Sequence, residues 1–167
     1  MGHREHHERS RKNVNVAIVV VSDSRTQDTD ESGKVASDLL EKKGHTIVEH
    51  HLIGNDRDAI ANTLSEMTNR ADIDVILTIG GTGISKKDIT VDVLSPLMEK
   101  KLEGFGEMFR MMSFRQIGAG ALMSRSTAGV INGKVGMCLP GSTAAIRLAV
   151  RRIIIPEIGH IVYEATR

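Results

Sequence analysis

The segment Val75–Gly83, with the sequence VILTIGGTG, decides the fold of this 167-residue chain. Its first five residues form an apolar run of the length of a buried strand, and the next four form a loop of glycine and threonine. In open α/β sheets, ligands bind outside the carboxyl ends of the strands. Glycine accepts positive φ values and lets the backbone approach a bound group closely. The segment therefore predicts an α/β fold with a candidate binding loop at Gly80–Gly83.

Other apolar runs extend this pattern along the chain. Strand-like runs cover Val14–Val21, Thr46–Ile53 and Val130–Leu139, and the last is interrupted by Asn132-Gly133. We expect helices around Val35–Leu40, around Ile60–Met67, from Thr90 as N-cap to Met98, over Glu107–Arg115 and from Ile146 to a break at Pro156. Strands that alternate with helices predict a mainly parallel sheet covered by helices, and Asn-Gly between apolar arms predicts an antiparallel β-hairpin.

Composition bounds the class of protein. Hydrophobic residues make up 40% of the chain and aromatic residues only 2%, so we expect one domain with an aliphatic core. The formal net charge of +1 disfavours nucleic acid as a partner, and no stretch approaches the ~20 apolar residues of a membrane helix. A cytoplasmic location is the expectation. Residues 1–13 are polar and lack apolar periodicity, which predicts a flexible arm before a domain at residues 14–167.

Three loops of small or polar residues follow apolar strands: Ser22-Asp23-Ser24, Gly80–Gly83 and Pro140-Gly141-Ser142. Taken singly, each is an ordinary turn or helix entry. The carboxyl ends of parallel strands meet at one edge of a sheet, so the three loops are expected to converge. Free backbone N–H groups and the positive end of a helix dipole attract phosphate, and the loops together therefore predict a phosphate-binding cleft.

Asp88 follows the glycine loop by five residues, after Lys86 and Lys87. A carboxylate beside a phosphate repels it unless a cation lies between them. Mg²⁺ is commonly held by one or two carboxylates together with substrate phosphates, so Asp88 is a candidate Mg²⁺ ligand. The alternative is that Asp88 is a turn residue and that the two lysines are solvated charges.

A series of motifs resembles the molybdenum cofactor biosynthesis family, the MoaB/MogA type of molybdopterin adenylyltransferase. The motifs are TIGGTG at 78–83, KDIT at 87–90, GFGEMFR at 104–110, MSF at 112–114, SRS at 124–126, AGV at 128–130 and LPGS at 139–142. Their order and spacing are similar to those of the family, and the similarity also covers VVVSDS at 19–24. The block MFRMMSF at 108–114 favours the MoaB branch.

The resemblance implies a three-layer α/β/α fold and adenylylation of molybdopterin by ATP with Mg²⁺, which releases pyrophosphate. It places Asp88 and Asp56 as the catalytic, metal-binding residues. The residues implied for the nucleotide phosphates are Gly80, Gly81, Thr82, Gly83 and Thr90. Those implied for molybdopterin are Ser22, Asp23, Ser24, Glu107, Arg110, Ser124, Arg125, Pro140, Gly141 and Ser142. Other enzymes of the molybdenum cofactor pathway are implied as partners.

The chain departs from the family after its second strand, where relatives carry Pro-Asp and this sequence reads Gly-Asn-Asp at 54–56. Without a gap, Asn55 takes the place of the aspartate and Asp56 follows one residue later. The departure supports an alternative function, a non-catalytic molybdopterin-binding or scaffolding protein of the same pathway. Glu107 and Arg110 share one helix face, and they form either part of the pterin pocket or a surface ion pair.

Apolar residues exceed what one buried helix stripe requires in two places. The first is the helix that carries Phe105, Met108, Phe109, Met112 and Phe114, and the second is the run Ile153–Ile155. Surplus apolar surface marks an association site, and closed rotational symmetry covers it. Together with the family resemblance, this predicts a homo-oligomer, a trimer or a hexamer built from two trimers.

Overall fold

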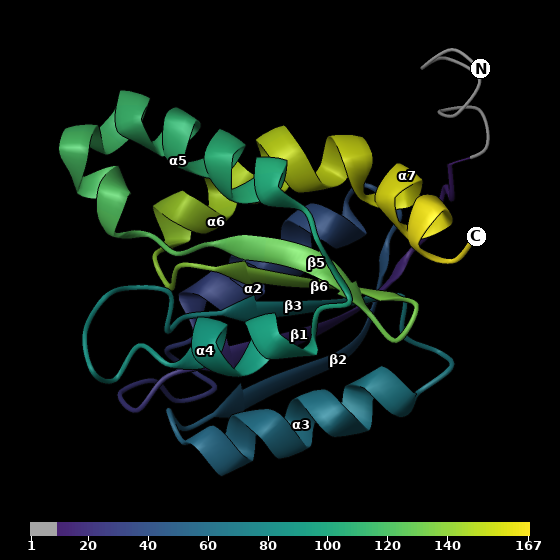
Figure 1. The fold of residues 1–167 in the computed structure, drawn as a ribbon, viewed down its shortest axis with the longest axis horizontal. Coiled ribbons are helices and arrows are strands. Elements are labelled where there is room, and N and C mark those ends of the chain that lie inside the picture. Colours follow the sequence, from purple (N-terminus) through teal and green to yellow (C-terminus); the bar gives the residue numbers. More distant parts are fainter. Residues whose placement is uncertain (1–9) are drawn as a thin grey trace.

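The computed structural model describes residues 10–167 and consists of one six-stranded sheet with helices on both faces (Figure 1). The strands are β1 (Asn15–Val21), β2 (Thr46–Ile53), β3 (Val75–Ile79), β4 (Lys100–Lys101), β5 (Thr127–Ile131) and β6 (Lys134–Leu139). The α-helices are α2 (Glu31–Glu41), α3 (Arg57–Asn69), α4 (Thr90–Leu94), α5 (Glu103–Ile117), α6 (Thr143–Ala149) and α7 (Ile155–Ala165). Short helices of other types are η1 (Ser95–Leu97), η2 (Gly118–Met123) and η3 (Val150–Ile154).

The strand order in the sheet is β2-β1-β3-β6-β5-β4. The first four strands of this order run parallel, and β5 pairs with β6 and with β4 in antiparallel fashion. Asn132 and Gly133 both have positive φ, at 48° and 71°, as the two-residue turn of a hairpin requires. The α/β/α fold with a mainly parallel sheet and one hairpin is therefore confirmed.

Alternating side chains of the central strands supply two separate cores. Val16, Ile18 and Val20 of β1 face one layer, which contains α2, α5, α6 and α7. Ala17, Val19 and Val21 of the same strand face the other layer, made by α3 and α4. Because both faces are covered, the strand is apolar throughout, as its sequence predicts.

Two glycines connect β3 to the loop that follows it. Gly80 has φ of 106°, and a Cβ atom there would collide with the carbonyl oxygen of Val21. Gly81 has φ of 68°, and a Cβ atom there would collide with the side chain of Thr90. These contacts hold the loop against the end of β1 and against the first turn of α4.

Several predicted details are wrong. Thr90 is the first residue of α4 and not its N-cap, which is Ile89 without a side-chain hydrogen bond. The helix ends at Leu94, four residues earlier than expected, and continues as a 3-10 turn at Pro96 because proline cannot supply the next backbone N–H group. The edge strand β4 was not predicted, because its two exposed lysines show no apolar pattern typical of a strand.

Of the predicted arm at residues 1–13, residues 1–9 lie outside the described residues. From residue 10 onward, the chain contacts the domain. The backbone N–H of Arg11 donates to the carbonyl oxygen of Gly159 at 3.2 Å, and the Arg11 side chain pairs with Asp74 at 2.6 Å. The last four residues of the predicted arm are therefore packed against α7 and the base of the sheet.

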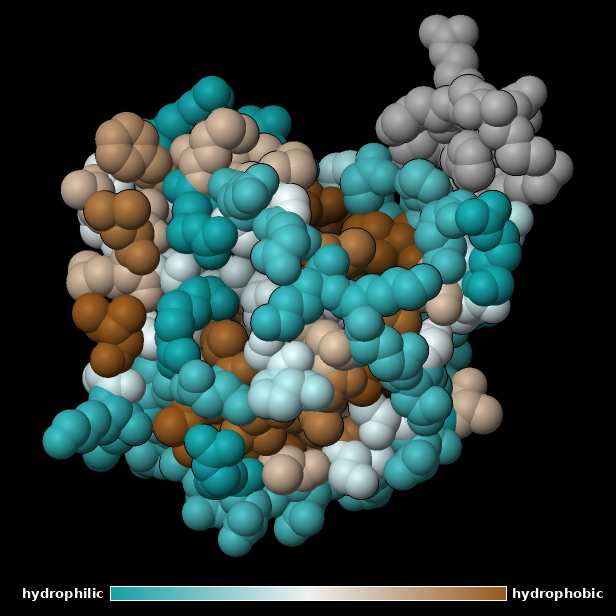
Figure 2. All heavy atoms as spheres, viewed as in Figure 1, coloured by the Kyte–Doolittle hydropathy of each residue, from teal (hydrophilic) through white to brown (hydrophobic). Residues whose placement is uncertain are grey.

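The two segments with excess apolar residues differ in how far the structure buries them. Ile153 and Ile154 are 5% and 1% exposed, because η3 is a π-helical segment that packs within the same subunit. The Ile153–Ile155 run therefore gives no ground for association. Around the end of α5, in contrast, large apolar side chains remain 43–80% exposed: Met108, Met111, Phe114, Ile117, Leu122 and Met123. Figure 2 shows apolar residues gathered over this part of the molecule.

We predict that Gly80→Ala lowers the free energy of unfolding by about 3–5 kcal/mol, because it combines an unfavourable φ with a clash against backbone. Gly44→Ala is the matched control, since Gly44 also has positive φ but no atom near its missing Cβ. The control is expected to cost about 1–2 kcal/mol. Urea denaturation measures both values. Equal losses in the two variants would show that the contact with Val21 contributes nothing.

Candidate functional site

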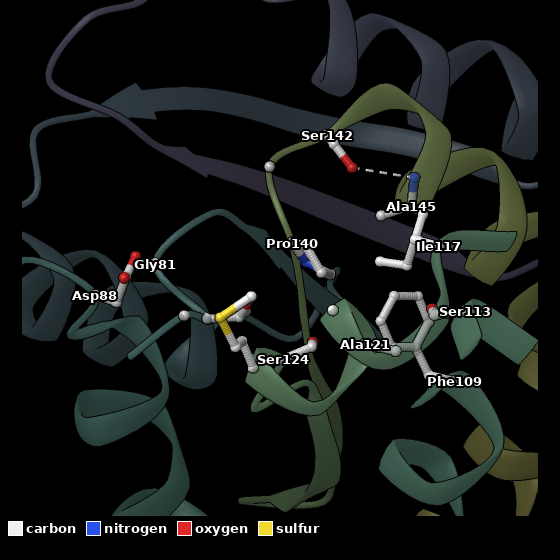
Figure 3. A pocket seen from close by; sticks show the side chains of 15 residues that line it. Gly81, Asp88, Phe109, Ser113, Ile117, Ala121, Ser124, Pro140, Ser142 and Ala145 are labelled. Carbon is white, nitrogen blue, oxygen red and sulfur yellow. Dashed lines mark hydrogen bonds between the residues drawn. The ribbon is translucent and has the colours of Figure 1, made fainter. Parts of the chain in front are cut away.

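A cleft of about 310 Å³ opens at the carboxyl ends of β3 and β6. Its walls are Gly81, Thr82, Gly83, Asp88, Phe109, Ser113, Ile117, Gly120, Ala121, Met123, Ser124, Pro140, Gly141, Ser142 and Ala145. Figure 3 shows Gly81 and Asp88 on one side, Phe109, Ser113, Ile117 and Ala121 on the other, and Ser142 with Ala145 at a third side. We call this hollow the candidate cleft.

Two of the three predicted loops line the candidate cleft. The N–H of Gly80 donates to the carbonyl oxygen of Leu139 at 2.8 Å, so the loops after β3 and β6 begin side by side. Ser142 is the N-cap of α6, and its hydroxyl accepts from the N–H of Ala145 at 3.2 Å. The predicted convergence of Gly80–Gly83 and Pro140–Ser142 is thus present in the structure.

The loop after β1 does not line the cleft. Asp23 accepts a hydrogen bond from the N–H of Asn55 at 2.8 Å, so its carboxylate holds the turn after β2. Ser22 and Ser24 hydrogen-bond each other locally. The loop reaches the cleft through Arg25, which donates to the carbonyl oxygen of Gly141 at 2.6 Å and which the sequence reading did not select.

Asp88 faces the candidate cleft beside the glycine loop. One of its carboxylate oxygens accepts from the N–H of Ser85 at 2.9 Å, and a Cβ atom on Gly83 would lie 2.6 Å from the same oxygen. Gly83 therefore provides room for the carboxylate. The carboxylate therefore lies beside the loop whose N–H groups attract phosphate, and a phosphate bound there would need a cation next to Asp88.

Two buried oxygen atoms near this loop have no hydrogen-bond partner among the described residues: the Asn55 side-chain carbonyl and the Thr90 hydroxyl. The amide nitrogen of Asn55 donates to the carbonyl oxygen of Lys87, next to Asp88. Asp56 instead caps α3, and its carboxylate accepts from the N–H of Ala59 at 2.8 Å. Asp56 does not line the candidate cleft, and the position beside the Asp88 segment belongs to Asn55.

Oxygen donors of this kind fit a hard cation such as Mg²⁺. Among residues 10–167, however, no cluster of three or more His, Cys, Asp or Glu side chains occurs. A cation there would be held by Asp88 and by oxygen atoms of the ligand.

The guanidinium of Arg125 forms hydrogen bonds to other groups of the protein. It donates to the carbonyl oxygens of Gly83 at 2.8 Å and of Asp88, and it forms two hydrogen bonds to the carboxylate of Asp92 at 2.7 and 3.0 Å. The hydrogen bond from Arg125 lowers the pKa of Asp92. Arg125 therefore holds the segment that carries Asp88, and it does not line the candidate cleft as the predicted pterin ligand would.

Of the remaining residues predicted to bind molybdopterin, some line the candidate cleft and others do not. Ser124 lines the cleft, whereas Glu107 is exposed outside it. Arg110 points to the start of β5, with its guanidinium 3.4 Å from the carbonyl oxygens of Ser124 and Ser126. Glu107 and Arg110 form no ion pair with each other in residues 10–167, so the predicted surface pair is also not observed.

Cys138 is buried in β6, and burial raises the pKa of its thiol to about 12. A thiol that remains protonated at neutral pH is a poor nucleophile, so Cys138 is a structural residue.

The sequence reading missed the wall made by α5 and η2, which contributes Phe109, Ser113, Ile117, Ala121 and Met123. A signal for it is present in the charge distribution. Residues 108–156 contain no aspartate or glutamate, but seven lysines and arginines. This segment supplies most of the lining of the candidate cleft, so the cleft has one carboxylate, Asp88. None of the seven basic residues lines the cleft, so an anionic ligand there would be held by backbone N–H groups of the loops and by a cation at Asp88.

The fold and the cleft define an α/β protein with a candidate binding cleft at the carboxyl ends of its central strands. The family model described as "Probable molybdopterin binding domain" matches residues 17–160. The chain belongs to this molybdopterin-binding family.

Individual relatives agree with this assignment. The chain is similar to molybdenum cofactor biosynthesis protein B from Bacillus anthracis, with 43% identity over 98% of this chain and 97% of the relative. A crystal structure of a molybdenum cofactor biosynthesis protein B matches with a TM-score of 0.89 and 42% identity, covering 92% of this chain and 96% of the other. The tungsten cofactor synthesizing protein MoaB from Pyrococcus furiosus matches with a TM-score of 0.85 and 32% identity, over 95% and 100% of the two chains. Within residues 10–167, no helix is long and apolar enough to cross a membrane.

Arg125→Lys is predicted to loosen residues 82–92, because lysine cannot reach two carbonyl oxygens and a carboxylate at once. Amide hydrogen exchange of this segment should become faster, and the stability should fall by about 1–2 kcal/mol. Arg115→Lys is the matched control on an exposed position and should change neither value.

The acid dependence follows from the lowered pKa of Asp92. The contribution of the ion pair is present above the usual pKa of an aspartate and is lost as the pH falls through the lower folded-state value. Exchange protection of residues 82–92 should therefore decrease in acid in the wild type. Identical acid profiles for wild type and Arg125→Lys would contradict the assigned role.

Proposed function

We propose that this protein binds molybdopterin in the candidate cleft and, with Mg²⁺, transfers the adenylyl group of ATP to its terminal phosphate during molybdenum cofactor biosynthesis. The observation that carries the proposal is a cleft lined by two strand-end loops, in which Asp88 is the single carboxylate among the lining residues. Family membership and relatives that are molybdenum cofactor biosynthesis proteins support the choice of molybdopterin as the ligand.

The reaction joins two anions. A terminal phosphate oxygen of molybdopterin forms a bond to the α-phosphorus of ATP, and the bond from that phosphorus to the pyrophosphate group breaks. The attacking phosphate already carries negative charge near neutral pH, so it needs no strong general base. The protein must instead hold the two phosphates in line and reduce their repulsion, effects that can supply several kcal/mol of catalysis.

The residues of the cleft divide these tasks. The backbone of Gly81–Gly83 would hold the ATP phosphates, and the loop Pro140–Ser142 with Ser124 would hold the pterin side. Asp88 would hold Mg²⁺, which when bound neutralises phosphate charge. Arg125 acts through Asp88, because its guanidinium holds the backbone of that residue. The wall of Phe109 and Ile117 would exclude water from one side of the reacting groups.

A second candidate function rests on Asn55. This residue occupies the position next to the Asp88 segment, and the neighbouring Asp56 serves as a helix cap. A single carboxylate in the cleft would hold a metal–phosphate complex only weakly, which disfavours adenylyl transfer. Binding of the pterin alone needs no carboxylate. A molybdopterin-binding or scaffolding protein that does not transfer the adenylyl group is therefore the alternative, and turnover separates the two functions.

Release of pyrophosphate from ATP, Mg²⁺ and molybdopterin tests the proposal. We expect turnover by the wild type and a loss of at least about 100-fold in Asp88→Asn, because this variant keeps the side-chain volume but loses the charge that holds the cation. Asp38→Asn, an exposed change on α2, serves as the control and should retain full activity. Molybdopterin binding without pyrophosphate release by the wild type would establish the alternative function.

We also propose a homo-oligomer, a trimer or a hexamer, on the basis of the exposed apolar residues around α5 and η2. Sedimentation equilibrium at micromolar concentration should give a mass of three or six chains. Phe114→Glu, which places a charge at a position 59% exposed, should shift the mass toward the monomer. Glu157→Gln on α7 provides a control remote from this surface. A wild-type monomer would overturn the proposal, and a stable dimer would overturn its threefold symmetry.

A further inference from the structure

A second hollow of about 310 Å³ lies against α6 and η3, outside the candidate cleft. It is lined by Gln116, Ala144, Arg147, Leu148, Arg151 and Arg152. Half of these residues are arginines, and all three arginines are exposed. We call this hollow the arginine groove.

The arginines of the groove differ from most others in the protein. Five other arginines pair with carboxylates, for example Arg11 with Asp74 at 2.6 Å and Arg125 with Asp92 at 2.7 Å. Within residues 10–167, no carboxylate lies within ion-pair distance of the three groove arginines, and no hydrogen bond occupies their guanidinium groups. The groove therefore retains a full set of donors for an external anion.

Placing these cations together is unfavourable without such an anion. Arg147 and Arg151 are four residues apart on one continuous helical segment, and like charges at this spacing destabilise a helix. Along the chain, the nearest acidic residues are Glu107 and Glu157, and Glu157 pairs with His160 at 3.2 Å. A surface built in this way is stabilised when an anion binds.

The arginine groove adjoins the candidate cleft. Gln116 and Ala144 line the groove, and the residues that follow them, Ile117 and Ala145, line the cleft. The end of α5 and the start of α6 therefore form a common wall between the two hollows. An anion in the groove would lie next to the phosphate-binding edge of the sheet.

We propose that the arginine groove is a second anion site, which binds a diphosphate group, either free or esterified to an organic molecule. Guanidinium groups bind phosphate oxygens in a bidentate manner, and three of them match the charge of a diphosphate better than that of a monophosphate. Gln116 adds a neutral hydrogen-bond donor, and the aliphatic side chains of Ala144 and Leu148 offer contact area to an organic group. The site does not depend on whether the protein transfers an adenylyl group.

Methyl NMR of the full-length protein tests the proposal, with Ala144 and Leu148 as reporters of the groove and Ala121 as a reporter of the candidate cleft. Inorganic pyrophosphate is added without metal at physiological ionic strength. The groove methyls should shift in a saturable manner. Arg147→Gln/Arg151→Gln should weaken this binding by at least about tenfold, because two charge-assisted contacts are lost. The control Arg57→Gln/Arg115→Gln removes the same two charges at exposed positions outside the groove, and its affinity should stay within about twofold.

A parallel titration with ADP identifies the source of the diphosphate. Tighter binding of ADP at the groove methyls assigns the site to a diphosphate ester, and equal binding assigns it to the inorganic ion. Shifts confined to Ala121 would overturn the proposal, as would equal weakening by the control and by Arg147→Gln/Arg151→Gln. Pyrophosphate release by the same variants is measured separately, so failure of the groove and failure of adenylyl transfer are distinguishable.

Discussion

The structure depends on the close packing of the chain at Gly80 and Gly81, where β3 ends. Neither position has room for a side chain, because Gly80 lies against the carbonyl group of Val21 and Gly81 against Thr90. This packing brings the glycine loop between the ends of β1 and β6 and sets the start of α4. The segment 82–92 then folds over the sheet edge, where Arg125 holds it through Gly83, Asp88 and Asp92. A loop with several glycines is thereby made into one fixed wall of the candidate cleft.

The opposite wall follows a different constraint. It is made by α5 and η2, whose apolar residues on the inner side line the candidate cleft and on the outer side remain exposed. The two walls differ in chemistry, since the glycine loop and Asp88 form the first and apolar side chains such as Phe109 and Ile117 form the second. This distribution suits a ligand whose anionic end binds through a cation at Asp88 and whose larger organic body packs on the apolar wall. Phosphorylated pterin is such a ligand, so the lining of the cleft is compatible with the molybdopterin-binding family to which the chain belongs.

The central part of the fold could be predicted from the sequence because local patterns determine it. The bounds of β2 and β3 agree with prediction, and β1 differs by one residue. The apolar runs of β1 and β3 are buried between two helical layers, whereas the edge strand β2 is only partly buried. The edge strand β4 could not be predicted, because its two lysines are strand residues only through their pairing with β5. The π-helical segment η3 likewise depends on tertiary packing, which buries Ile153 and Ile154 on more than one side.

For the site, the sequence located the loops but not the direction of the side chains. Asp88 and Ser124 line the candidate cleft, whereas Arg125 and Asp56 form internal hydrogen bonds that only the folded chain reveals. The most direct measurement of the central claim is transfer of label from α-phosphate-labelled ATP to molybdopterin by the purified protein with Mg²⁺. The account predicts one labelled adenylyl group on each molybdopterin converted, and label that stays in ATP while molybdopterin is bound would contradict it.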